Sequence, residues 1–145
     1  MADDQTVAIM APLSGVIVPL ERVPDPVFSQ KMVGDGVSID PTSTDLLAPC
    51  DGRIVQIHKA HHAVTIETPE GVEVMMHVGI DTVAPKGRGF QLRTDEGAEV
   101  KTGDILLTFN ADYVATHAKS LLTQIVITNG ERMSACETAS GMVRA

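Results

Sequence analysis

Apolar residues in this chain come in short, β-branched runs. Each run is bounded by Gly, Pro or Asp, and the runs recur at intervals of about ten residues. They are TVAIM, GVIVPL, DGRIVQI, AVTIE, GVEVMM, DILLTF and QIVIT. Short runs separated by turn residues are typical of strands rather than helices. The sequence therefore predicts an all-β domain, an antiparallel β-sandwich or barrel-sandwich.

Two segments depart from this pattern. NADYVATHAKS, residues 110–120, opens with Asn110, a residue type that commonly caps helix N-termini, and carries apolar residues at helical spacing. PDPVFSQKM, residues 24–32, predicts one further helical turn. No low-complexity linker divides the chain, and 145 residues fit a single domain over 1–145. We therefore expect one β domain with one or two short helical turns.

An internal repeat supports the same fold. APLSGVIVPL at 11–20 and APCDGRIVQI at 48–57 share the pattern A-P-x-x-G-x-I-V, 37 residues apart, and ASGMV near the C-terminal end is a weaker third copy. Because the segments between the copies differ, the repeat indicates a duplicated motif with equivalent strands in one sandwich rather than a solenoid.

Composition excludes several classes of protein. The formal charge is −8 and the 11 basic residues are scattered, which argues against nucleic acid and favours a basic protein partner. No apolar run approaches the roughly 20 residues of a membrane span, and the acidic N-terminus is unlike a secretory signal. We therefore expect a cytoplasmic protein without direct membrane insertion. Cys50 and Cys136 are too few and too widely spaced for a disulfide framework.

The hairpin around residues 68–71 has a predictable register. Pro69 cannot take the positive φ of a primed two-residue turn, so a type I turn closed by a left-handed Gly71 is favoured. Thr68 then faces Val72, and residues on alternate positions share a face. We expect the core face to carry Val64, Ile66, Val72, Val74, Met76 and Val78, and the other face Ala63, Thr65, Glu67, Glu73, Met75 and His77.

Two histidines meet on this hairpin. His77 lies opposite Ala63, with Cβ atoms about 4.5–5.5 Å apart, and His62 is one position away. Ideal alternation puts His62 on the core face, so a shared site requires the chain to bend at His61–His62 and predicts ring nitrogens within hydrogen-bonding reach.

Two imidazoles in contact can ligate a metal, share acid–base duty or carry a covalent group. A closed zinc site takes four ligands, and only Glu73 or Asp81 is near enough in sequence to complete one, so we expect no resident metal. No Ser-His-Asp order, as in serine hydrolases, is present. KMVGDG and GIDTV match neither the G-x-G-x-x-G pattern nor the Walker pattern of nucleotide-binding loops, so we expect no cofactor.

Three stretches carry a resemblance to a known family. They are APLSGVIVPLERVPDPVFSQKMVGDGVSI, LLAPCDGRIVQIHKAHHAVTIET and GVEVMMHVGIDTVAPKGRGF, with the two histidines 15 residues apart. In this order they resemble the glucose-type enzyme IIA domain of the bacterial phosphoenolpyruvate-dependent sugar phosphotransferase system, over nearly all of residues 7–145.

The resemblance implies a β-sandwich phosphocarrier, a phosphotransferase with a phosphohistidine intermediate. His77 would accept a phosphoryl group on Nε2 from the phosphohistidine of HPr and pass it to a cysteine of a sugar-specific IIB domain. His62 would steady the phosphate, and the Gly79 carbonyl would hold the other nitrogen of His77. The resemblance also implies an apolar docking patch and acidic positions that meet arginine on HPr, and it allows permeases or kinases as regulated partners. The patch residues are Val27, Phe28, Met75 and Val83; the acidic ones are Asp25 and Asp81.

The sequence also departs from the family. Ala60 replaces a hydroxyl residue two positions before His62, His61 replaces an Asn, and Met75 replaces a Phe. His61 is the candidate to substitute for the hydrogen bond of the missing hydroxyl. Because the chain stops at SGMVRA, where the family continues into a further strand, we expect a domain cut from a longer chain that fuses IIA to HPr and enzyme I.

Two other classes compete with this interpretation. A lipoyl- or biotinyl-type carrier is suggested by the A-P-x-x-G repeat, the KTGD turn and Lys59, but the DKA or MKM site of those carriers is missing. A zinc peptidase would need an HxH motif, whereas MMHVG has one histidine. A metal held jointly by His62, His77 and a partner's carboxylate stays open. The sequence does not specify the sugar.

Overall fold

In the computed structural model the chain forms two antiparallel sheets; the residues described are 7–81, 88–130 and 141–143. The larger sheet has eight strands in the order β11-β1-β2-β10-β6-β5-β4-β8, and the smaller has three in the order β3-β9-β7. The strands are β1 (Gly15–Pro19), β2 (Asp35–Pro41), β3 (Asp45–Leu47), β4 (Gly52–Ile57), β5 (Ala63–Glu67), β6 (Glu73–His77), β7 (Phe90–Leu92), β8 (Glu99–Val100), β9 (Ile105–Phe109), β10 (Thr123–Ile127) and β11 (Gly141–Val143).

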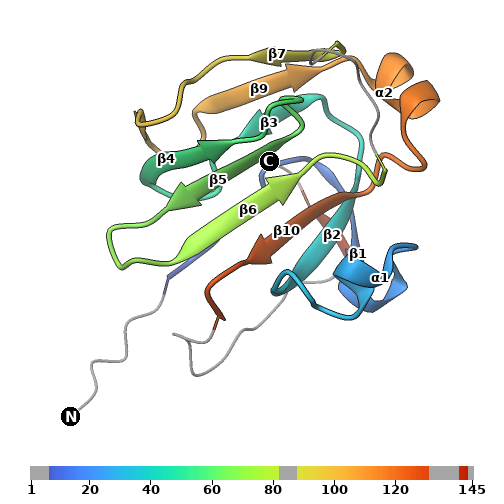
Figure 1. Cartoon of the computed structure of the whole chain (residues 1–145), viewed down its shortest axis with the longest axis horizontal. Coiled ribbons are helices and arrows are strands. Elements are labelled where there is room, and N and C mark those ends of the chain that lie inside the picture. Colours follow the sequence, from blue (N-terminus) through green and yellow to red (C-terminus); the bar gives the residue numbers. More distant parts are fainter. Residues whose placement is uncertain (1–6, 82–87, 131–140, 144–145) are drawn as a thin grey trace.

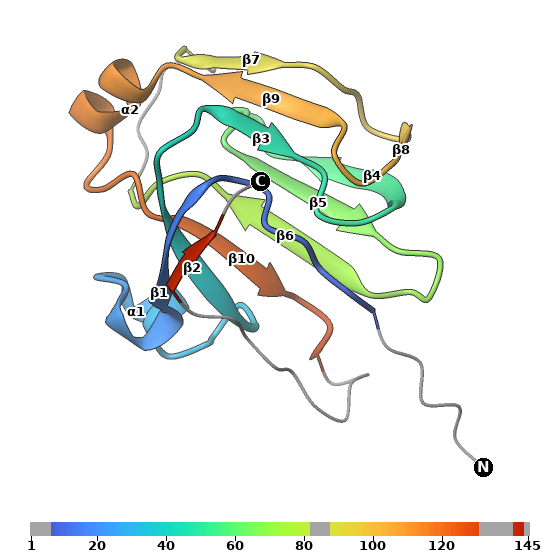
Figure 2. The same cartoon turned by 180° about the vertical axis from the view of Figure 1, so that it is seen from behind.

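The two sheets face each other as a β-sandwich, which confirms the predicted fold class (Figures 1 and 2). The main core lies between them. It takes Val64, Ile66, Val74 and Met76 from the large sheet and Leu46, Leu106, Leu107 and Phe109 from the small one.

A second, smaller cluster lies on the outer face of the large sheet. Ile125 and Ile127 of β10 belong to the main core, whereas Val126 between them belongs to the second cluster, so strand alternation assigns the two clusters to opposite faces. We call this second set the outer cluster; it consists of Leu20, Val23, Phe28, Ile80 and Val126. It buries the segment that leads from β1 to β2.

The repeat occupies equivalent places in the large sheet. β1 and β4, which carry the two copies, are each second from an edge, and β10 and β6 pair at the centre. β1 pairs with β2 and β11, just as β4 pairs with β5 and β8. The third copy contributes β11, although residues 139–140 lie outside the described chain. The prediction of equivalent strands is confirmed.

Both predicted helical segments are present and short. Asn110 Oδ1 accepts a 3.0 Å hydrogen bond from Tyr113 N and caps α2 (Ala111–His117). Asp25 Oδ1 accepts one of 2.9 Å from Val27 N and caps α1 (Pro26–Ser29), which follows the 3₁₀ turn η1 (Leu20–Arg22). No helix among the described residues is long and apolar enough to span a membrane.

Some strand predictions were wrong or missing. The described part of TVAIM, residues 7–10, is not a strand; Met10 N donates a hydrogen bond of 2.8 Å to Pro49 O. β2, β3 and β7 were not predicted, because β2 contains Asp, Gly and Pro and the other two have three residues each. Position 36 requires glycine because of a contact with a distant strand: a Cβ on Gly36 would lie 1.9 Å from the Ile125 carbonyl oxygen.

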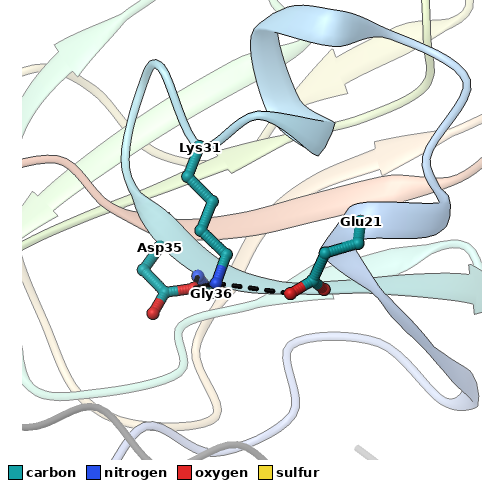
Figure 3. Close-up of polar contacts among 4 residues, drawn as sticks. All are labelled: Glu21, Lys31, Asp35 and Gly36. Atoms are coloured by element: carbon teal, nitrogen blue, oxygen red, sulfur yellow. Dashed lines mark hydrogen bonds and ion pairs between the residues drawn. The ribbon is translucent and has the colours of Figure 1, made fainter.

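Three charged side chains tie the α1 segment to the sheet (Figure 3). The Lys31 ammonium lies 3.3 Å from Glu21 Oε2 in η1 and 3.3 Å from Asp35 Oδ1 in β2. Asp35 Oδ1 also accepts a hydrogen bond of 2.8 Å from Gly36 N. The hydrogen bonds to Asp35 and then to Glu21 raise the pKa of Lys31. Exposed ion pairs add little stability, so we infer that this network mainly orients the α1 segment.

Candidate functional site

The β5–β6 hairpin has the predicted register. Ala63 pairs with His77 and Glu67 with Glu73, and Thr68 N donates to Val72 O at 2.9 Å. Gly71 closes the turn, with φ of 89° and a 2.9 Å hydrogen bond from its N to Thr68 O. The predicted core face is buried except for the half-buried Val72 at the turn, and His77 lies on the other face. The prediction that His77 is outside the core is confirmed.

His77 is the last residue of β6 and is half-buried. Strand β6 runs toward the side of the molecule that carries both α1 and α2 (Figures 1 and 2). Nδ1 of His77 lies 2.9 Å from the carbonyl oxygen of Gly79, as expected. A carbonyl only accepts, so Nδ1 carries the proton and Nε2 of the neutral ring keeps its lone pair. That nitrogen has the lone pair that a nucleophile needs.

His62 reaches the same site because the chain bends just before β5. His61 has φ of 67°, and its N donates to His58 O at 2.8 Å, while His58 N donates to Ala63 O at 2.9 Å. The His62 ring is 6% exposed and meets the His77 ring edge to face, with centroids 4.6 Å apart and planes at 80°. The expected bend and the contact of the rings are therefore present. Hydrogen-bonding reach between the ring nitrogens stays a prediction.

Both rings are held in the neutral form. Burial lowers the pKa of His62 from 6.5 to about 4, and the nearby His77 and His58 rings add to the decrease. Burial also lowers the pKa of His77; its hydrogen bond to Gly79 opposes this shift, His58 adds to it, and Asp25 opposes it. A neutral imidazole is the form that can act as a nucleophile, so the environment suits chemistry at Nε2 of His77 near pH 7.

Acidification is expected to destabilise the fold through His62. The unfolded chain protonates this ring as the pH falls through about 6.5, but the folded chain does so only near pH 4. Between these values the unfolded state binds more protons, so the free energy of unfolding should fall by about 2–3 kcal/mol between pH 7 and pH 4. Urea unfolding at several pH values measures this. His62→Gln should lose that share of the pH dependence, and an unchanged dependence would contradict the assignment.

The predicted docking residues differ in their surroundings. Val27 is 42% exposed and Met75 half-buried, whereas Phe28 is only 5% exposed. Phe28 was expected on the surface patch; instead it lies in the outer cluster, with its ring centroid 5.2 Å from that of His77. It therefore packs against the His77 ring rather than presenting a face to a partner. Val83 lies outside the described residues.

The two acidic residues expected at a partner surface have distinct settings. Asp25 is half-buried and its carboxylate caps α1, so it has a structural role whether or not it meets a partner. Asp81 is exposed and has φ of 48°, four residues after His77. Asp25 is also close enough to His77 for its charge to oppose the decrease in the pKa of that ring.

Sequence reasoning overlooked His58. Its ring centroid lies 4.4 Å from that of His62, and its Nδ1 accepts a 3.0 Å hydrogen bond from Ala60 N. His61 was the candidate to interact with His62 in place of the missing hydroxyl. Besides His77, however, the histidine ring that contacts His62 among the described residues is that of His58. The sequence shows that His58 lies four residues before His62. This spacing brings the two rings into contact only because the chain bends at His61.

Other candidate chemistries have less support in the described chain. No group of three or more His, Cys, Asp or Glu side chains in that part is arranged to hold a metal ion. Cys50 is buried, and burial raises the pKa of its thiol to about 11, so it is not a nucleophile near pH 7. Cys136 lies outside the described residues.

Comparisons with known proteins agree on one family. A family model described as phosphoenolpyruvate-dependent sugar phosphotransferase system, EIIA 1, matches residues 7–133. The glucose-specific EIIA component of Borreliella burgdorferi is 43% identical over 136 residues, covering 94% of this chain and 72% of that protein. The corresponding Bacillus cereus component is 44% identical over 134 residues, covering 92% and 81%. The solved glucose permease IIA from Mycoplasma capricolum is similar with a TM-score of 0.91 at 35% identity, over 99% of this chain and 94% of that one.

Proposed function

Since the chain belongs to the EIIA 1 family of the phosphoenolpyruvate-dependent sugar phosphotransferase system, and so is a phosphocarrier component of sugar uptake, we propose that His77 is its phosphorylated residue. In this proposal Nε2 of His77 takes the phosphoryl group from the phosphohistidine of HPr. It then passes the group to a cysteine of a sugar-specific IIB domain. We place both exchanges in the cytoplasm.

The observation that carries this proposal is the hydrogen bond of 2.9 Å between His77 Nδ1 and the Gly79 carbonyl. It leaves the Nε2 lone pair free to attack phosphorus while the N–P bond to HPr breaks on the opposite side. In the second step the thiolate of IIB attacks phosphorus and the bond to Nε2 breaks, which returns His77 as a neutral imidazole. Phosphoryl transfer depends chiefly on such in-line positioning and on charge stabilisation.

His62 supplies the charge stabilisation in this proposal. Its ring stands edge to face against His77 and is nearly fully buried, so an N–H on it acts in a site with little water. A donor aimed at the transferring group is worth more in such surroundings than in bulk solvent. His62 would thus hold the phosphoryl oxygens during both exchanges.

The surface around the site suits a basic, partly apolar partner. Val27 in α1 is 42% exposed and Met32 shortly after it is 70% exposed, so both present apolar area. The Asp25 carboxylate caps the same helix, and Asp81 is exposed four residues after His77. The net charge of −8 would steer a positively charged partner toward the chain. The similar proteins carry glucose in their names, so a glucose-specific IIB domain is the first acceptor to test.

Incubating the purified chain with phosphoenolpyruvate, enzyme I and HPr tests the proposal. We expect the mass gain of one phosphoryl group, labile in acid and stable in alkali as an N–P bond requires, and its loss on addition of a IIB domain. A related IIA protein of known activity is the positive control for the same reagents. No mass gain under conditions that phosphorylate the control would overturn the proposal. A mass gain with lipoate or biotin ligase would instead favour the competing carrier class.

A further inference from the structure

One polar atom of the site is left without a partner. Nδ1 of His62 is buried and makes no hydrogen bond with the described residues, although the His62 side chain is only 6% exposed. The corresponding nitrogens of the neighbouring rings are satisfied, by Gly79 O for His77 and by Ala60 N for His58. An unpaired buried polar atom is costly, and in the tautomer with the proton on Nε2 this nitrogen needs a hydrogen-bond donor.

Among the described rings that contact His62, one has an N–H to offer. The described rings in contact with His62 are those of His58, His77 and Phe90. Phe90 has no donor, and the N–H of neutral His77 is used by Gly79. Ala60, two residues before His62, has no polar side chain. His58 is therefore the remaining candidate among the described ring neighbours.

The tautomer of His58 is set by the backbone. Its Nδ1 accepts the N–H of Ala60, so in the neutral ring the proton must reside on Nε2. The ring is exposed to solvent yet packs against His62, with centroids 4.4 Å apart and planes at 48°. For the His58 and His62 rings to form a hydrogen bond, one ring must turn while the two stay in contact.

The tautomer of His62 matters because this ring is neutral. Its pKa of about 4 leaves it with a single N–H near pH 7. If that proton is on Nε2, the ring can donate to a phosphoryl group; if it is on Nδ1, the Nε2 lone pair faces the phosphoryl oxygens and repels them. A donor to Nδ1 selects the productive form.

We propose that His58 is a positioning residue of the phosphoryl site, whose Nε2–H donates to Nδ1 of His62 and holds His62 in the tautomer with Nε2–H. The inference rests on the proposed function of His77 and His62. The resulting chain of donors runs from Ala60 N–H through His58 and His62 to the phosphoryl group on His77.

The test combines imidazole ¹⁵N chemical shifts with transfer kinetics. The shifts report the tautomer of each histidine in the unphosphorylated protein, and they do not depend on phosphoryl transfer. His58→Phe keeps a ring against His62 and removes the donor, and His58→Gln restores an N–H donor without the ring. His61→Asn is the matched control, since Asn tolerates the positive φ of the bend.

In the wild type we expect His62 to be predominantly Nε2–H with a hydrogen-bonded Nδ1. His58→Phe should shift His62 toward Nδ1–H, leave the His77 tautomer unchanged, and slow transfer to the IIB domain about tenfold, the scale of losing a partner that orients a functional histidine. His58→Gln should recover the His62 tautomer and most of the rate, and His61→Asn should match the wild type.

Distinct outcomes separate this inference from the proposed function. An Nδ1–H tautomer of His62 in the wild type, or an unchanged His62 tautomer in His58→Phe, overturns the role of His58 even if phosphorylation proceeds normally. The tautomer of His62 in the wild type is measured without any variant, so this test stays valid even if the substitutions disturb the fold. Absence of phosphorylation in the wild type, with the His62 tautomer as expected, overturns the proposed function instead.

Discussion

The variant His77→Ala should accept no phosphoryl group from phosphorylated HPr. The proposed nucleophile is Nε2 of this ring, and the His62 ring in contact with it is buried. Loss of a nucleophile reduces a covalent transfer by about four orders of magnitude or more. Mass spectrometry after incubation with phosphoenolpyruvate, enzyme I and HPr measures the effect.

A matched control excludes a general effect of histidine removal. His117 is also half-buried, but it stacks on Tyr113 in α2, and its Nδ1 bonds to Tyr113 O rather than reaching the site. His117→Ala should be labelled like the wild type. Thermal unfolding of both variants shows whether the fold is retained. Normal labelling of His77→Ala would refute the assignment of the phosphorylated residue.

His62→Gln should be phosphorylated but should pass the group on slowly. The amide can still hydrogen bond to a phosphoryl oxygen, so a stable phosphorylated form is expected. The imidazole N–H is held in place by the contact of its ring with His77, whereas an amide at this position has no such ring contact, and the placement of the donor matters most in the pentavalent transition state. Removing a donor of this kind costs about 10²–10³ in rate, and we expect transfer to the IIB domain to fall by this factor.

Single-turnover transfer from the phosphorylated variant to a IIB domain measures this directly. His61→Asn is the control, because Asn tolerates the positive φ of the bend next to His62 and the His61 ring is not among the described ring contacts of His62. Its transfer rate should stay near that of the wild type. A wild-type rate for His62→Gln would show that the second ring does not act on the transferring group.

Local chemistry accounts for the predictions that succeeded. Pro69 and Gly71 leave one favourable turn, and from that turn the alternation of strand residues assigns every side chain of the hairpin to a face. Asn110 and Asp25 cap their helices with contacts two or three residues away. Such interactions are encoded within a few residues, so no knowledge of the rest of the chain is needed.

Long-range packing accounts for the predictions that failed. β2 contains turn-forming residues, yet it becomes a strand because β1 and β10 pair with it on both sides, with Gly36 pressed against Ile125. Phe28 is next to exposed residues in the sequence, and its burial depends on Ile80 and Val126, which reach the outer cluster from distant parts of the chain.

The family, the sandwich and the pairing of His77 with Ala63 follow from the order of residues, because they depend on turn chemistry, side-chain alternation and a repeat that a linear string displays. The surroundings of the two imidazoles do not. How deeply His62 is buried and which rings touch it depend on a bend at His61 and on contacts between segments far apart in the chain. Free energies of desolvation and hydrogen bonding are set by neighbours in space, and those neighbours exist only after the sheets have closed over one core.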